Sequence, residues 1–209
     1  MPQIIPVEHW RHRATLAQAR NLLGKYLVGP AGEARMITEV EAYDGERDLA
    51  CHARAGRTRR TEVLYGAGGV WYVYLCYGVH EMLNLVVGPR DWPAAVLIRG
   101  VEGCQGPGRL TRALGINRRH NGTAVHPAGG TWIEDRGVRV PRRLVRATPR
   151  IGVDYAGPVW AGKPWRFYFD PAALRRGTPK PAVRDSPPEP RRAPSAAGSR
   201  PASRRRSRT

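Results

Sequence analysis

Two segments decide the fold of this chain: Ile37-Thr-Glu-Val-Glu-Ala-Tyr43 and Trp71-Tyr-Val-Tyr-Leu-Cys-Tyr-Gly-Val-His80. In the first segment apolar or small residues alternate with polar ones, a pattern typical of a β-strand. Side chains two residues apart on a strand point the same way, so Glu41 and Tyr43 should project side by side. Glu39 shares that face, and we expect it to accept structural hydrogen bonds.

The second segment predicts a β-hairpin. Aromatic and β-branched residues dominate its first arm, and an apolar run from Met82 to Val87 follows a turn that contains Gly78. Tyr77 should therefore lie at or near the tip. Alternation places Tyr72 and Tyr74 on one face of the first arm.

Asn84 interrupts the apolar return arm of this hairpin. A lone amide in such a run either satisfies a buried backbone group or faces a ligand. Both interpretations stay open from the sequence. From pattern alone, the order of strands and helices predicts only an α+β domain.

Charge and composition limit the classes of function. The chain has 209 residues and a formal net charge of +18, with 32 arginines and three lysines. Residues 171–209 carry 11 basic and two acidic side chains, so both the tail and the body are basic enough to favour a polyanion. We expect one domain over residues 1–176 and a disordered basic tail rich in Arg, Pro and Ser over residues 177–209.

Cysteine content and hydropathy indicate the compartment. No apolar run approaches the length of a membrane span, and the N-terminus lacks a signal-peptide pattern. Three cysteines without CxxC spacing argue against a disulfide framework or a zinc site. We expect an intracellular protein that binds no metal, needs no cofactor and does not associate with membranes.

Several motifs along the chain resemble those of the alkyladenine (3-methyladenine) DNA glycosylase family, which releases damaged purines from duplex DNA. They occur in family order and span about four fifths of the chain, at residues 19–28, 38–43, 52, 72–78, 95–99, 106–117, 150–153 and 163–168. The resemblance implies a single mixed domain around a curved, largely antiparallel sheet with a protruding hairpin.

The resemblance also implies roles for individual residues. Glu41 matches the general base, which with Arg99 and a backbone carbonyl near Val153 would hold the attacking water. Tyr43, His52 and Tyr74 match the pocket that encloses the flipped base. Asn84 matches the position that crowds the 2-amino group of guanine, and Tyr77 matches the residue that fills the gap left in the DNA.

Exposed arginines are the candidates for contact with the DNA backbone, and such contacts position a protein without reading sequence. They lie in the loop after His52 and in the motif at residues 106–117: Arg57, Arg59, Arg60, Arg109 and Arg112. The expected partner is double-stranded DNA that contains damaged purines. We expect a monomer in the bacterial cytoplasm, associated with the nucleoid.

Two other classes of function compete with a monofunctional DNA N-glycosylase of base excision repair. A metal-dependent nuclease could use carboxylate and imidazole ligands, namely Glu41, Asp48, His52 and His80. A noncatalytic nucleic-acid-binding protein would explain the charge and the aromatic residues alone. No lysine nucleophile is apparent, so we expect a hydrolase that leaves an abasic site.

Overall fold

The computed structural model describes residues 1–177, which belong to one compact unit. The predicted tail lies outside the described residues, except that Gly177 is the last residue of a helix. The strands are β1 (Gln3–Ile4), β2 (Tyr26–Val28), β3 (Ala34–Asp44), β4 (Trp71–Cys76), β5 (His80–Val87), β6 (Ala94–Val101), β7 (Cys104–Gln105), β8 (Trp132–Asp135), β9 (Arg146–Thr148) and β10 (Arg166–Tyr168). The helices are α1 (Thr15–Leu22), α2 (Pro107–Ala113), α3 (Gly157–Ala161) and α4 (Pro171–Gly177).

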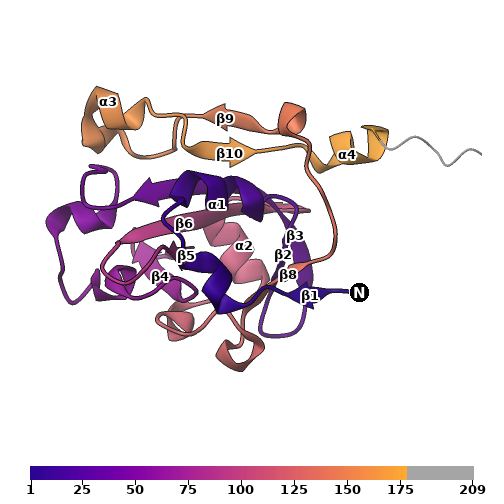
Figure 1. Cartoon of the computed structure of the whole chain (residues 1–209), viewed down its shortest axis with the longest axis horizontal. Coiled ribbons are helices and arrows are strands. Elements are labelled where there is room, and N and C mark those ends of the chain that lie inside the picture. Colours follow the sequence, from indigo (N-terminus) through magenta and orange to yellow (C-terminus); the bar gives the residue numbers. More distant parts are fainter. Residues whose placement is uncertain (178–209) are drawn as a thin grey trace, which may run out of the picture. The chain divides into compact units, whose positions relative to one another are not determined.

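The described strands form one antiparallel sheet with the order β1-β8-β2-β3-β6-β5-β4. β10 joins the sheet beside β3 and carries β9 on its other side, while β7 pairs with β6. Figure 1 shows β9 and β10 running together, with α3 at one end of the pair and α4 at the other. The prediction of an α+β domain built around a largely antiparallel sheet is confirmed.

The long strand β3 is the centre of this arrangement because it pairs with three neighbours, β2, β6 and β10. The register between β3 and β6 shifts on both sides of Glu39, which marks a bulge. Beyond the bulge the alternation is regular, with Val40 and Ala42 in the main core and Glu41 opposite Leu97. The sequence pattern therefore predicted the two faces of this strand correctly.

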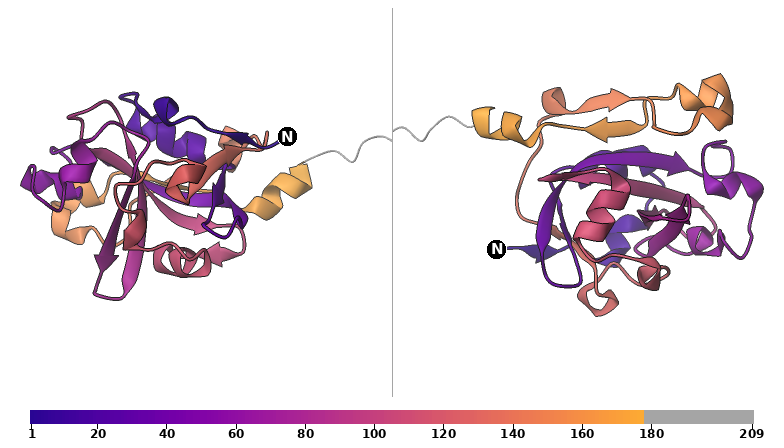
Figure 2. Two further views of the ribbon diagram at one scale, coloured as in Figure 1. Left: turned by 90° about the horizontal axis from the view of Figure 1, so that it is seen from below. Right: turned by 180° about the vertical axis from the view of Figure 1, so that it is seen from behind.

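The main core lies between one face of the sheet and the helices. Leu22 of α1 and Leu110 of α2 are buried in the same cluster as Val96 of β6 and Leu85 of β5. α1 is nearest the viewer in Figure 1, and α2 is nearest in the rear view of Figure 2. The helices thus cover the core from two directions and leave the opposite face of β3, β5 and β6 free to line a cavity.

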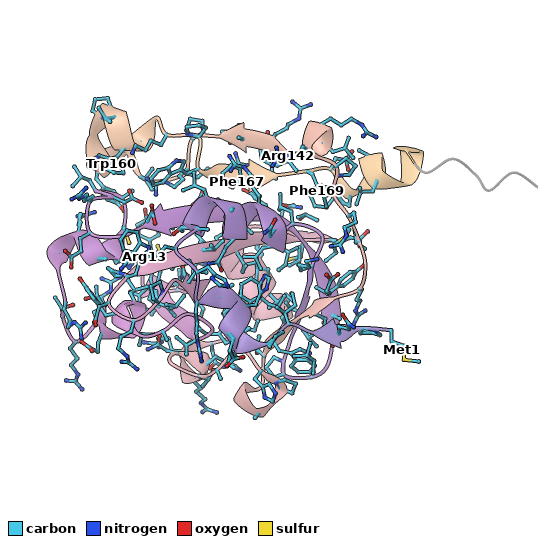
Figure 3. The ribbon with its side chains drawn as sticks, viewed as in Figure 1. Met1, Arg13, Arg142, Trp160, Phe167 and Phe169 are labelled. Carbon is cyan, nitrogen blue, oxygen red and sulfur yellow. The ribbon has the colours of Figure 1, made fainter. Side chains whose placement is uncertain are left out.

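The β10 segment closes the domain through its aromatic residues. Phe167 and Phe169 are buried in the main core, and both are labelled in Figure 3 on the side of β10 that faces α1. The guanidinium of Arg20 in α1 lies 4.3 Å from the centre of the Phe167 ring. This packing fixes β10, and the turn before it, against β3.

The predicted hairpin is present and its tip is exposed. β4 pairs with β5 from Trp71 opposite Leu85 to Cys76 opposite His80, which leaves three residues in the loop. Tyr77 is the first of them and Gly78 follows, both at positive φ. The left view of Figure 2 shows a two-stranded arm, in the colour of residues near 75, that projects from the domain.

Candidate active site

A cavity of about 590 Å³ opens between the β4–β5 hairpin, β6 and the segment that follows β9. This volume falls within the range of small-ligand sites. Six ring-bearing residues contribute to its walls: Tyr43, His52, Tyr72, Tyr74, Tyr77 and Tyr155. The structure therefore brings together residues that lie more than 100 positions apart in the sequence.

Glu41 lies directly behind the wall of this cavity and is fully buried. Its Oε2 accepts a hydrogen bond from the Tyr43 hydroxyl at 2.8 Å, and its Oε1 accepts one from the Ile151 backbone N–H at 2.8 Å. Both donors belong to residues that line the cavity. A carboxylate has about four acceptor positions, so these two hydrogen bonds do not use all of them.

Burial raises the pKa of the Glu41 carboxyl above its usual range. The Arg99 guanidinium, the Ile151 N–H and the Tyr43 hydroxyl act in the opposite direction because they favour the charged form, while Glu39 adds to the rise. A carboxylate with a raised pKa is a better proton acceptor, which is the property that a general base needs near neutral pH.

Arg99 is shared between two carboxylates. Its Nε lies 3.1 Å from Glu39 Oε1 and 3.4 Å from Glu41 Oε1. Glu39 also accepts a hydrogen bond from Arg166 Nε at 2.5 Å, so its charge is balanced from two strands. The expectation that Glu39 accepts structural hydrogen bonds is thus confirmed, and Arg99 stands between it and Glu41.

The aromatic walls form a connected set. His52 begins a short 3-10 helix, and its Nδ1 lies 3.0 Å from the Tyr72 hydroxyl. The rings of His52 and Tyr74 lie 4.5 Å apart, and those of Tyr72 and Tyr74 lie 5.4 Å apart. Burial, together with the nearby Arg60 and Arg54, lowers the pKa of His52 to about 4, so its imidazole is neutral at pH 7.

Asn84 satisfies backbone carbonyl groups, which confirms the first of the two interpretations that the sequence left open, and a contact with a ligand stays a prediction. Its Nδ2 donates to the backbone carbonyls of Tyr72 and Met82, each at 3.1 Å, and its side chain also lines the cavity. The two hydrogen bonds fix the amide in one orientation.

Val153 also lines the cavity and is buried. Its carbonyl accepts a hydrogen bond from the Ala156 N–H at 2.9 Å. A carbonyl oxygen has two lone pairs, so this one keeps an acceptor position for another donor. Tyr155, two residues on, donates its hydroxyl hydrogen to the Ala50 carbonyl at 3.0 Å.

The candidate arginines differ in their surroundings. Arg57 forms ion pairs with Glu62 and Asp91, whereas the guanidinium of Arg60 lies 5.5 Å from the centre of the Tyr74 ring at the cavity. Arg59, Arg109 and Arg112 are exposed. A phosphate at Arg57 would have to compete with two carboxylates. Arg60 is therefore better placed than Arg57 for contact with a DNA phosphate.

Glu81, close to the hairpin tip, pairs with Arg118 at 3.3 Å. Its negative charge is thus partly balanced on the surface that carries Tyr77. The residues proposed as ligands of a nuclease metal do not converge, because Asp48 is paired with Arg150 and Glu41 with the donors already described. Residues 1–177 contain no group of three or more His, Cys, Asp or Glu placed to hold a metal ion.

Sequence reasoning missed three contributors: the Ile151 N–H, the Tyr155 ring and the Asp48–Arg150 ion pair. A backbone donor leaves no trace in residue type, and Tyr155 follows no periodic pattern. Asp48 and Arg150 are 102 positions apart, so their pairing depends on the tertiary fold. The one available signal was the place of Arg150 at the start of the family motif at residues 150–153.

Comparison with known proteins places this chain among relatives. Residues 9–173 match the family described as methylpurine-DNA glycosylase. A protein from Anaeromyxobacter sp. (strain Fw109-5), named "Putative 3-methyladenine DNA glycosylase", is 46% identical over 168 residues, which is 76% of this chain and 85% of the relative. Proteins of the same name from Myxococcus xanthus and Rickettsia africae are 44% and 37% identical, over 82% and 80% of this chain and 94% and 91% of the relatives.

The family match covers far more than half of the chain and includes each wall of the cavity. The relatives match over most of their own lengths as well. No helix among residues 1–177 is long and apolar enough to cross a membrane. The chain belongs to the methylpurine-DNA glycosylase family, whose members are DNA-repair hydrolases of N-glycosyl bonds.

Proposed function

We propose that this protein turns damaged purines out of duplex DNA into the aromatic cavity and hydrolyses the N-glycosidic bond with a water activated by Glu41. One observation carries the proposal: a fully buried carboxylate contacts two residues that line a ring-walled cavity. The product would be an abasic site. We further propose a monomer that acts on DNA in the bacterial cytoplasm, since one chain supplies every wall of the cavity.

The cavity chemistry suits an alkylated purine. A base inside a duplex stack is out of reach of Glu41, and its extrusion costs a few kcal/mol. Stacking on an aromatic side chain returns about 1–3 kcal/mol per base, and a cationic ring gains further attraction to the faces of Tyr43 and Tyr74. A neutral His52 adds no positive charge that would repel such a base.

The bond changes follow from the position of Glu41. Its carboxylate accepts a proton from the water, whose oxygen forms the new bond to the sugar C1′. The C1′–N bond breaks, and its electron pair leaves with the purine. A single carboxylate that activates water in this way resembles inverting glycoside hydrolysis, and an N-alkylated purine leaves without an acid partner.

The surroundings of the lysines support hydrolysis by water. Lys25 is held by Asp135 at 2.6 Å, and the Lys163 ammonium lies 3.5 Å from the centre of the Trp160 ring. Neither residue lines the cavity. Lys180 lies outside the described residues. A strand-cleaving lyase reaction through an amine is therefore not part of the proposal.

One assay separates the glycosylase from a nuclease and from a simple binding protein. The full-length protein is incubated with duplex DNA that contains hypoxanthine or 3-methyladenine, with and without a chelator, and then treated with alkali. Strand breaks at the lesion that need alkali and resist the chelator support the proposal. Direct breaks, or breaks that a divalent ion restores after chelation, would overturn it.

A further inference from the structure

A buried ion pair lies outside the catalytic roles assigned so far. Asp48 and Arg150 both have side chains without solvent exposure, and the guanidinium binds both carboxylate oxygens, Nη1 to Oδ2 at 2.5 Å and Nη2 to Oδ1 at 2.8 Å. Removing two charges from water is costly, so a buried pair is a weak source of stability compared with apolar packing. Its position in the molecule therefore needs another explanation.

Arg150 joins segments that surround Glu41. Its Nη1 also donates to the carbonyl of Ala42, the residue after Glu41 on β3, at 2.9 Å. Its Nη2 donates to the Trp160 carbonyl in α3 at 3.3 Å, and the guanidinium lies 4.8 Å from the centre of the Tyr43 ring. Strand β3, the loop that carries Asp48 and the segment after β9 are thus fixed to one planar group.

Asp48 is itself held by its own loop. Its Oδ2 accepts a hydrogen bond from the Asp44 N–H and its Oδ1 accepts one from the Ala50 N–H, each at 3.1 Å. The carboxylate therefore has a defined orientation before it meets Arg150. Bidentate pairing transfers that orientation to the guanidinium, because both groups are planar.

The residue after Arg150 donates directly to Glu41. The Ile151 N–H lies 2.8 Å from Glu41 Oε1, and it belongs to the peptide unit attached to the Arg150 Cα. Gly152, at φ +73°, then turns the chain so that Val153 lines the cavity. A displacement of Arg150 would move the hydrogen-bond donor to Glu41 and the Val153 carbonyl together.

We propose that Asp48 and Arg150 are positioning residues for Glu41: they hold residues 150–153 so that the Ile151 N–H orients the carboxylate and Val153 faces the water. The inference rests on the proposed function, in which Glu41 is the general base. Neither residue touches the substrate in this arrangement. Their effect reaches the reaction through the Ile151 N–H and the placement of Val153.

The proposal predicts a change in the pH dependence of base release, because a small set of charged and hydrogen-bonding groups acts on the pKa of Glu41. Its own strand supplies Glu39 and Tyr43, β6 supplies Arg99, the segment after β9 supplies Arg150, and β10 supplies Arg166, which pairs with Glu39. The Ile151 N–H favours the charged form of Glu41. If that donor moves away, the pKa of Glu41 rises further. As the pH falls, the variant should then lose base release at a higher pH than the wild type does.

The test is Arg150→Lys, which keeps the charge opposite Asp48 but has only three N–H donors, so it cannot make all four hydrogen bonds of the guanidinium to Asp48, Ala42 and Trp160. Single-turnover release of hypoxanthine is measured across pH, together with lesion binding and melting temperature. We expect a rate about 10- to 100-fold lower with binding unchanged, since small misplacements of catalytic groups have effects of this size. The acid limb of the pH profile, where the rate falls as the pH is lowered, should shift to higher pH.

Asp135→Asn is the matched control, because it breaks the ion pair with Lys25, and neither residue of that pair lines the cavity. It should lower the melting temperature and leave the pH profile unchanged. Asp48→Asn carries the same test if Arg150→Lys fails to fold, since an amide keeps the shape and one acceptor. A folded Arg150→Lys or Asp48→Asn protein with the wild-type rate and acid limb would overturn the inference.

Failure of the proposed function has a different signature. If Glu41 is not the base, the Glu41→Gln protein retains activity, and its acid limb is the same as that of the wild type. If only the positioning role is wrong, Glu41→Gln is inactive while the Arg150 and Asp48 variants match the wild type. The two failures are thus distinguishable in the same experiment.

Discussion

The inner and outer ends of the cavity differ in how completely the protein itself fixes them. At the inner end Glu41 is fully buried, and each of its oxygens accepts a hydrogen bond from a protein donor. At the outer end Tyr77 is 90% exposed and adopts φ +49°, a conformation that costs energy for a residue with a side chain. Val79 beside it is also exposed.

This contrast indicates that the two ends have different roles in the proposed reaction. A group that must accept a proton in a defined direction benefits from a rigid environment that exists before the substrate arrives. A ring that enters DNA gains its partners only in the complex, so exposure and strain in the free protein are what the proposed role requires. The inner end should therefore control the rate of base release, and the outer end should control binding to the lesion.

Glu41→Gln, a change at the inner end, should have the largest effect on the rate of base release. The amide keeps the size of the side chain and an acceptor for the Ile151 N–H, but it cannot take a proton from water. Loss of general base catalysis typically lowers a rate about 10²- to 10⁴-fold. Single-turnover release of hypoxanthine should fall by at least this amount while lesion binding persists. Near-normal release would remove Glu41 from the mechanism.

Tyr77→Ala should have the opposite signature. Loss of a ring that stacks in DNA costs about 1–3 kcal/mol, or roughly a 5- to 150-fold weaker complex with lesion DNA. Tyr77→Gly is a useful companion because glycine adopts the positive φ without strain, so it should stabilise the loop yet bind equally weakly. Val79→Ser serves as an exposed neighbour that should bind normally. Tight binding by both Tyr77 variants would contradict the intercalation role.

These two ends were not equally predictable from the sequence. Alternation in residues 37–43 placed Glu41 beside Tyr43, and the turn at Gly78 placed Tyr77 at a tip, because both features depend on local backbone periods. The bulge at Glu39 and the Ile151 hydrogen bond depend on pairing between distant segments. No local pattern encodes such pairing, and the same is true of the Asp48–Arg150 ion pair.

Asn84→Ser tests a wall between the two ends. The shorter side chain should open space opposite the 2-amino group of guanine, so guanine release should rise relative to hypoxanthine release. It should also lose two buried hydrogen bonds to Tyr72 and Met82, at a cost of about 1–3 kcal/mol in stability. The measurements are the ratio of the two release rates and the melting temperature. A lower melting temperature with an unchanged ratio would leave Asn84 a purely structural role.

Tyr43→Phe tests one hydrogen bond at the inner end, because it removes the hydroxyl that donates to Glu41 and keeps the ring. The hydroxyl favours the charged form of Glu41, so its loss should raise the pKa of that carboxyl further. Release requires the carboxylate, and the acid limb of the pH profile should therefore shift to higher pH, with little change in rate well above the limb. An unshifted limb would mean that the Tyr43 hydroxyl does not act on the reacting form of Glu41.

Deleting residues 178–209 should have the smallest effect on the reaction, since the cavity residues that the structure describes all lie between Tyr43 and Tyr155. The cut leaves α4 complete at Gly177 and removes nine basic and two acidic side chains. Single-turnover release at saturating protein should stay near the wild-type rate. Binding to undamaged DNA should weaken, and its dependence on salt should become shallower, because each phosphate contact contributes a slope of about −0.9 in log K against log salt. If the truncated protein keeps the slope of the full chain, the tail does not tether the enzyme to DNA, and the basic residues of the body account for its affinity.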